Sequence, residues 1–209
     1  MSLSTVRILI LAFAGLAAAP GVYLWWRQAM PEARIARTAE TRTGTATIGG
    51  PFALTDHRGT RVTEAVLQGR LSLIYFGYAS CPDICPTELQ TLSAALDLLA
   101  ASNAGKIQDV QGFLITVDPD RDTVAALADY MSHFHPGLAA LTGSADEIAT
   151  VAKAYRVYYN KAEAQSDPQS YLMDHSNIIY LMGRDGKFLA HFSMDASAEQ
   201  IAAKLREFL

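Results

Sequence analysis

The chain places its two cysteines, Cys81 and Cys85, in one short segment, CPDICP. Each cysteine precedes a proline, and a residue before proline is disfavoured in the α-helical region. We therefore expect Cys81 on a loop and Cys85 at the start of a helix, where Pro86 suits the first turn. The positive end of a helix dipole favours thiolate over thiol. The segment thus predicts two neighbouring sulfurs that are ready for thiolate chemistry.

This pair of sulfurs is compatible with three kinds of chemistry. A structural disulfide would close a very small loop and add little stability. A redox-active dithiol usually shows the spacing C-x-x-C, whereas this chain has C-x-x-x-C. A metal site suits thiolates, because soft sulfur selects Cu(I), Zn(II) or iron–sulfur clusters, but such a site needs further ligands. The cysteines alone leave all three open.

The elements that must position these cysteines alternate between strands and helices. The continuous apolar runs at 71–78 and 112–118 predict strands that are buried on both faces. Between them, residues 86–101 predict a helix with one apolar face. The cysteines are thus expected just after a buried strand, where the next helix begins.

Turns and caps define the remaining elements. One hairpin is predicted at 51–66, and a second at 177–193 turns at Asp185-Gly186. Ser144 and Glu147 form a capping box at the start of another helix. The other expected elements are helices at 122–134, 144–156 and 197–209 and a short strand at 138–143. Their order predicts a thioredoxin-like three-layer α/β sandwich with a mixed central sheet.

One histidine is placed to complete a metal site. The other four have ordinary expected roles, at a solvated turn, near a helix end or along a strand: His57, His133, His135 and His191. His175 stands at the start of a buried strand, on a loop that faces the cysteine loop in a thioredoxin-like arrangement. An imidazole there can join two sulfurs in one site, and Asp174 can fix its tautomer from outside the ligand set.

The acidic run at 118–122, DPDRD, resembles the start of a calcium-binding loop but fits it poorly. The sixth position is Thr123 instead of Gly, and the twelfth is Asp129 instead of Glu. We expect instead that Asp122 caps the following helix and that Asp118 ends a strand.

The N-terminal region predicts a membrane anchor. Residues 8–26 contain no charge, and as a helix they span about 28 Å, close to the thickness of a bilayer core. We interpret 1–29 as one transmembrane helix, 30–46 as a linker and 47–209 as the folded domain. The small residues at 17–19 leave a cleaved secretory signal as the alternative. The arginines after the span oppose an outward-facing domain, although long domains are translocated regardless of such charges.

The charge of the chain argues against nucleic acid as a partner. Five Arg and two Glu lie in residues 1–43, whereas the remainder carries 12 Lys+Arg against 19 Asp+Glu. Such an acidic body lacks the basic patch that nucleic-acid binding requires. It suits a cationic or metal ligand, or a basic protein surface.

The motifs of the chain resemble those of the Sco/SenC family of copper-delivery proteins. The matching stretches are YFGYASCPDICPTELQTL, GFLITVDPDRDT, HFHPGLAALTG, AYRVYY and DHSNIIYLMGRDGKF, in this order from about residue 50 to the end. CPDICP together with the downstream DHS is the specific element. The departures are minor: Ser80 stands where many relatives have His, and Met173 where Val is common.

The resemblance implies both a ligand set and a function. By position, the copper ligands of the family fall on Cys81, Cys85 and His175, with Asp118 as a nearby acidic residue. The family implies a chaperone, not an enzyme, that binds Cu(I) and also Cu(II). It would help to load the binuclear copper centre of cytochrome c oxidase subunit two or another periplasmic copper protein.

The resemblance also implies an alternative and a location. As a thiol–disulfide oxidoreductase, the chain would use Cys81 and Cys85 as a redox-active pair that reduces the cysteines of a partner's copper site. The implied location is the bacterial inner membrane. One N-terminal helix would cross the lipid bilayer, and the soluble domain would lie in the periplasm.

Overall fold

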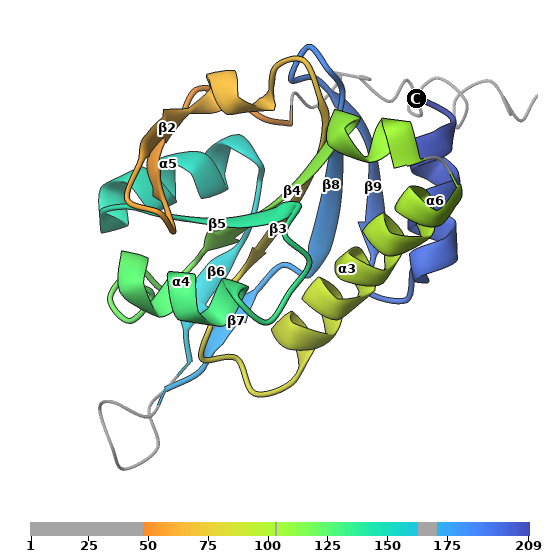
Figure 1. The fold of residues 1–209 in the computed structure, drawn as a ribbon. Coiled ribbons are helices and arrows are strands. Elements are labelled where there is room, and N and C mark those ends of the chain that lie inside the picture. The colour runs from red at the N-terminus through yellow and green to blue at the C-terminus, as the bar shows by residue number, and fades with distance from the viewer. Residues whose placement is uncertain (1–47, 103, 163–170) are drawn as a thin grey trace, which may run out of the picture. The chain divides into compact units, whose positions relative to one another are not determined.

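The computed structural model describes residues 48–102, 104–162 and 171–209 (Figure 1). Thr47–Leu209 form one compact unit. Within the described residues, no helix combines the length and the apolar character needed to cross a bilayer. The predicted anchor at 1–29 and the predicted linker at 30–46 lie outside the described residues.

The described residues form a seven-stranded mixed sheet. In spatial order its strands are β2 (Arg61–Thr63), β1 (Ala53–Asp56), β5 (Leu138–Thr142), β4 (Val110–Thr116), β3 (Leu71–Gly77), β8 (Ile178–Met182) and β9 (Phe188–Ser193). The central strands β3, β4 and β5 are parallel, whereas β8 is antiparallel to β3 and β1 is antiparallel to β5. A separate antiparallel pair consists of β6 (Tyr159–Lys161) and β7 (Met173–His175).

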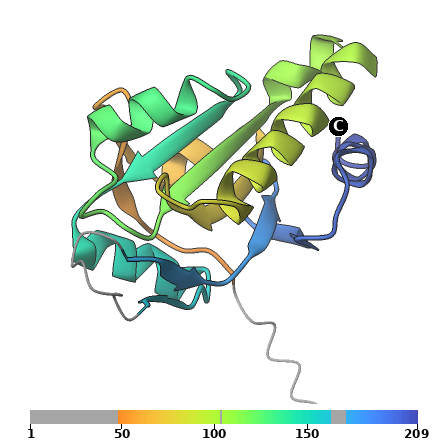
Figure 2. The ribbon, with the colours of Figure 1, turned by 90° about the horizontal axis from the view of Figure 1, so that it is seen from below.

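Helices cover both faces of this sheet. They are α3 (Ile84–Ser102), α4 (Val124–Met131), α5 (Ala145–Ala154) and α6 (Ala198–Arg206), with short 3-10 turns η1 (Glu64–Leu67) and η2 (Ala104–Asp109). α3 and α6 pack against each other. In the view from below, α3 and α4 lie on one side of the sheet and α5 lies on the other (Figure 2). This arrangement confirms the predicted thioredoxin-like sandwich with a mixed central sheet.

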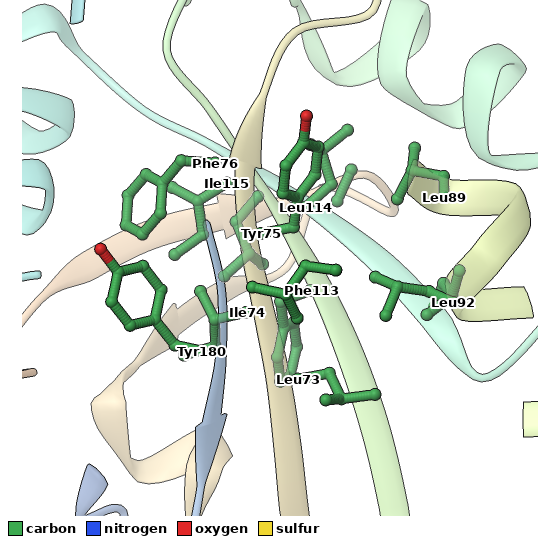
Figure 3. Packing of buried hydrophobic residues seen from close by; sticks show 14 of the residues in the cluster. Leu73, Ile74, Tyr75, Phe76, Leu89, Leu92, Phe113, Leu114, Ile115 and Tyr180 are labelled. Atoms are coloured by element: carbon green, nitrogen blue, oxygen red, sulfur yellow. The ribbon is translucent and has the colours of Figure 1, made fainter. Parts of the chain in front are cut away.

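The alternation of side chains along β3 builds the two halves of the core. All seven residues of β3 are buried. Figure 3 shows Leu89 and Leu92 of α3 on one side of the sheet and Phe76 and Tyr180 on the other. The Phe76 ring lies 5.5 Å from that of Tyr155, at the end of α5. The buried leucines of α3 recur at the predicted 3–4 spacing: Leu89, Leu92, Leu96 and Leu99.

The predicted turns and caps are largely confirmed. Ser144 and Glu147 form the expected capping box of α5. The hairpin between β8 and β9 turns through Gly186, whose φ of 72° is easily reached only by glycine. The pair β6–β7 was not predicted, because strands of three residues are too short to show a periodic pattern.

Candidate metal centre

Cys85 lies in the first turn of α3, where that helix meets the end of β3. Its side chain is fully buried. A Cβ built on Gly77 would lie 3.0 Å from the Cys85 sulfur and 2.8 Å from the ring of Tyr75. A side chain at position 77 would therefore push the helix start away from the strand. Glycine at this position allows the buried thiol to approach the sheet closely.

His175 ends β7 and faces Cys85 across 90 residues of sequence. The Cys85 sulfur lies 3.6 Å from Nε2 of His175. With the bond lengths of a tetrahedral zinc site, roughly 2.3 Å to sulfur and 2.0–2.1 Å to nitrogen, two ligands of one ion lie about 3.6 Å apart. The separation of the buried thiol and the imidazole fits two ligands of one ion, and it also fits a hydrogen bond between them in the metal-free protein.

Cys81 lies beside this pair on the loop before α3. Its sulfur accepts a hydrogen bond from the backbone N–H of Cys85 at 3.4 Å. Across residues 48–102, 104–162 and 171–209, no three His, Cys, Asp or Glu side chains are gathered closely enough to hold a metal ion. The structure therefore brings the Cys85 sulfur to His175 and the Cys81 sulfur to the backbone of Cys85, and the set of three ligands stays a prediction.

The two thiols have opposite acidities. Burial raises the pKa of the Cys85 thiol to about 12. Burial also acts to raise the pKa of Cys81, but hydrogen bonds from the backbone N–H groups of Asp83 and Cys85 outweigh it and leave that pKa below its usual value. The thiolate that was expected at the start of the helix is therefore favoured at half-buried Cys81 and disfavoured at Cys85.

The imidazole of His175 is neutral, and its unprotonated Nε2 faces the Cys85 thiol. Burial lowers the pKa of this histidine. Nδ1 lies 3.2 Å from the carbonyl oxygen of Ser176, and because a carbonyl only accepts, Nδ1 must carry the hydrogen. The expected role of Asp174 in fixing the tautomer is therefore wrong. Asp174 acts on His175 only through its charge.

Tyrosine rings and a shallow pocket surround the candidate ligands. The rings of Tyr75 and Tyr78 stand edge-on to the imidazole, at 6.2 and 5.9 Å between centroids. A pocket of about 270 Å³ opens beside Cys81 and His175. Its rim carries Ile84 and Leu172, which are 40% and 53% exposed. Half-buried Cys81 therefore lines the pocket, whereas the buried side chain of Cys85 does not.

Asp122 holds the cysteine loop by hydrogen bonds and does not cap the following helix as expected. The predicted helix cap is wrong, because Thr123 caps α4. Asp122 is buried instead, and its Oδ2 accepts hydrogen bonds from the Ala79 backbone at 3.0 Å and from the Thr116 hydroxyl at 2.6 Å. It thereby ties the start of the cysteine loop to the end of β4.

The other four histidines lie in ordinary structural settings. His57, which was expected to be solvated, is half-buried and accepts a hydrogen bond from the Ala140 backbone at 3.2 Å. His133 contacts a carbonyl of the last turn of α4, as its position near a helix end predicted. His135 and His191 are engaged with Gly137 and with the ring of Phe188, respectively.

Sequence reasoning missed the tyrosines around the site. Tyr75 and Tyr78 lie in or next to an apolar run, where a tyrosine is indistinguishable from an ordinary core residue. Tyr171 is likewise buried and donates its hydroxyl to Asp118 at 2.7 Å. Only the pairing of segments that are distant in sequence reveals these contacts.

Comparisons with known proteins agree over almost the whole fold. A family model described as SCO1/SenC matches residues 40–209. The mitochondrial SCO2 homolog of Bos taurus is 42% identical over 203 residues, which cover 97% of this chain and 75% of that protein. The SCO2-like protein of Rickettsia conorii is 37% identical across 97% of each chain.

The chain is also similar in fold to solved structures of Sco proteins. The structure of Bradyrhizobium japonicum ScoI with copper bound matches with a TM-score of 0.71 at 44% identity. That match covers 78% of this chain and 99% of the other. The family model spans the described fold, and each of the two relatives is similar over 97% of this chain. The chain therefore belongs to the SCO1/SenC family.

Proposed function

We propose that this protein is a copper chaperone whose ligands are Cys81, Cys85 and His175. The observation that carries the proposal is the 3.6 Å separation of the Cys85 sulfur from Nε2 of His175. Two soft thiolates and one imidazole suit Cu(I), and the nitrogen ligand also allows Cu(II). The similar B. japonicum protein was solved with copper bound, which supports copper as the ion.

The exposure of Cys81 indicates how copper enters and leaves. Three protein ligands leave room on the ion for a ligand from a partner. A thiol of that partner can displace Cys81 first, because Cys81 is half-buried and lines the pocket, and buried Cys85 afterwards. We propose cytochrome c oxidase subunit two, at its binuclear copper centre, or another periplasmic copper protein as the recipient. In this role the chain transfers an ion and catalyses no reaction.

The same proposal includes membrane attachment. The uncharged span 8–26 would hold the domain at the bacterial inner membrane, with residues 47–209 in the periplasm. Alkaline carbonate extraction of cells that express the full chain tests this. We expect the chain to stay in the membrane pellet, and its release into the supernatant would contradict an uncleaved anchor.

Metal analysis of the reduced full chain tests the ligand set. We expect one copper per chain and a thiolate-to-Cu(II) charge-transfer band after loading with Cu(II). His175→Ala should abolish that band, because it removes the only nitrogen ligand proposed, while Cu(I) stays on the two thiolates. His133→Ala is the matched control, since His133 is exposed at the end of α4. An unchanged Cu(II) spectrum in His175→Ala would show that the assigned site is wrong.

The unequal thiols favour a second candidate function, reduction of a partner's disulfide. The Cys81 thiolate would attack one sulfur of that disulfide and release the other as a thiolate. Cys85 would then attack Cys81, close an internal disulfide and release the second partner sulfur, passing its own proton to Nε2 of His175. The chain loses two electrons and the partner gains them. Fast disulfide reduction that needs both cysteines, in a chain that retains no copper, would favour this function over the first.

A further inference from the structure

Tyr171, a residue outside the proposed ligand set, lies two residues before the strand that carries His175. Tyr171 lies four residues before His175 and is buried. Its hydroxyl donates to Oδ1 of Asp118 at 2.7 Å, and its backbone carbonyl accepts from the guanidinium of Arg121 at 3.0 Å. Both partners belong to the loop between β4 and α4. Tyr171 is therefore held by its side chain and its backbone at once.

The aromatic ring of Tyr171 is also enclosed by positive charge. The Arg121 guanidinium carbon lies 3.7 Å from the ring centroid, and the Lys161 ammonium lies 3.5 Å from it. Cations over an aromatic face are attracted by its negative potential. Arg121 in turn forms an ion pair with Asp118. The three residues Asp118, Arg121 and Tyr171 thus form a closed set of contacts, which we call the Tyr171 clamp.

The same loop holds the cysteine side of the site. Asp122, next to Arg121, accepts a hydrogen bond from the Ala79 backbone at 3.0 Å, two residues before Cys81. On the opposite side, the hydroxyl of Tyr78 accepts from the backbone N–H of Met173 at 3.2 Å. One loop is therefore connected to the segment that carries the thiols and to the segment that carries the imidazole.

From this geometry we propose that the Tyr171 clamp sets the distance between the imidazole and the two thiols. Asp118, Arg121 and Tyr171 are then positioning residues that act through His175 without touching the ion. The inference rests on the proposed function for its effect on copper, but its geometric part concerns the metal-free protein as well. A Cu(II) site depends on the clamp more than a Cu(I) site does, because the two thiolates alone suffice for Cu(I).

The conservative variant Tyr171→Phe tests the clamp. It keeps the ring and removes the hydroxyl that binds Asp118. Tyr158→Phe is the matched control, because it makes the same chemical change on a ring that is 63% exposed. Arg121→Lys is a second variant, which keeps the charge but loses the planar group that bonds the Tyr171 carbonyl.

Two measurements on the full chain separate the outcomes. In the metal-free protein, amide hydrogen exchange at Met173 and His175 should become about tenfold faster in Tyr171→Phe and unchanged in Tyr158→Phe. In the copper-loaded protein, Tyr171→Phe should weaken Cu(II) binding about tenfold, the lower end of the range for residues that orient metal ligands, and shift the Cu(II) spectrum. Cu(I) binding should change little.

Each possible result supports or overturns one of the two proposals. Unchanged hydrogen exchange in both Tyr171→Phe and Arg121→Lys overturns the clamp, whatever happens to copper. Faster exchange with unaltered Cu(II) affinity and spectrum also overturns it, because the strand would then move without affecting the ligand. If the parent chain binds no copper at all, the proposed function fails while hydrogen exchange still tests the clamp. Should Tyr171→Phe unfold, which circular dichroism detects, Arg121→Lys provides the same test.

Discussion

Cys81 and Cys85 carry the same functional group in opposite environments. Hydrogen bonds from backbone N–H groups lower the pKa of Cys81, whereas burial raises that of Cys85 to about 12. At neutral pH Cys85 is therefore a protonated thiol whose S–H can donate to the unprotonated Nε2 of His175. Metal binding requires the thiolate, so if Cys85 is a ligand as proposed, copper loading would release its proton. The half-buried sulfur of Cys81 is therefore the one expected to react first, and the buried sulfur of Cys85 is expected to react only after it loses its proton.

This difference between the sulfurs predicts an order of alkylation. At pH 7, iodoacetamide should modify Cys81 at least about tenfold faster than Cys85, because only thiolates react and each unit of pKa changes their fraction about tenfold. Peptide mass spectrometry of a time course measures both rates. In urea the two rates should become similar, which serves as the control. Faster labelling of Cys85 in the folded chain would contradict the proposed roles of the two sulfurs.

At the scale of the elements, the loop between β4 and α4 supports the site at a cost in stability. Asp122 in this loop is buried, and burial raises its pKa even though hydrogen bonds from Thr116 and Ala79 oppose the rise. A carboxyl group with a raised pKa in the folded state favours folding when it is protonated. Its contribution is fully present below the unfolded-state pKa of about 3.9 and is lost as the pH rises through the folded-state value.

Asp122→Asn should therefore flatten the pH dependence of folding stability. Urea unfolding at pH 4, 5, 6 and 7 gives the free energy of unfolding of the parent and of the variant. We expect the parent to lose stability relative to Asp122→Asn as the pH rises over this range, by about 1.4 kcal/mol for each unit by which the pKa is raised. Parallel curves would mean that Asp122 titrates alike in the folded and unfolded chains.

At the scale of the whole molecule, the sequence predicts the elements that are controlled by local patterns. The apolar run of β3 and the leucine spacing of α3 follow from burial, and Ser144 and Gly186 follow from local backbone chemistry. Contacts between distant segments leave no such pattern. From the sequence, Tyr171 is indistinguishable from other aromatic residues, and Asp122 is interpreted as a helix cap. Only the folded structure reveals their contacts with Asp118 and with Ala79.

The candidate site could be predicted only in part, because only some of its features follow from local sequence patterns. Two cysteines before prolines indicate thiolate chemistry at the start of a helix, but the residues alone left a disulfide, a dithiol and a metal site open. His175 entered through the expected thioredoxin-like arrangement and through a family resemblance. The opposite acidities of the thiols depend on burial and backbone geometry, which no spacing encodes.

The proposed ligands join two parts of the chain that are ninety residues apart, so copper should stabilise the whole domain. A ligand that binds only the folded state adds about 2.7 kcal/mol when its free concentration is 100 times the dissociation constant. For a domain of this size each kcal/mol raises Tm by roughly 2–4 °C, so we expect an increase of at most about 5–11 °C with Cu(I), reduced by any binding of Cu(I) to Cys81 and Cys85 in the unfolded chain. Anaerobic calorimetry of the reduced chain, with Cu(I) added in a buffer that sets its free concentration, measures this shift. The double variant Cys81→Ser with Cys85→Ser should show none, and an equal shift in that variant would locate the stabilising copper elsewhere in the molecule.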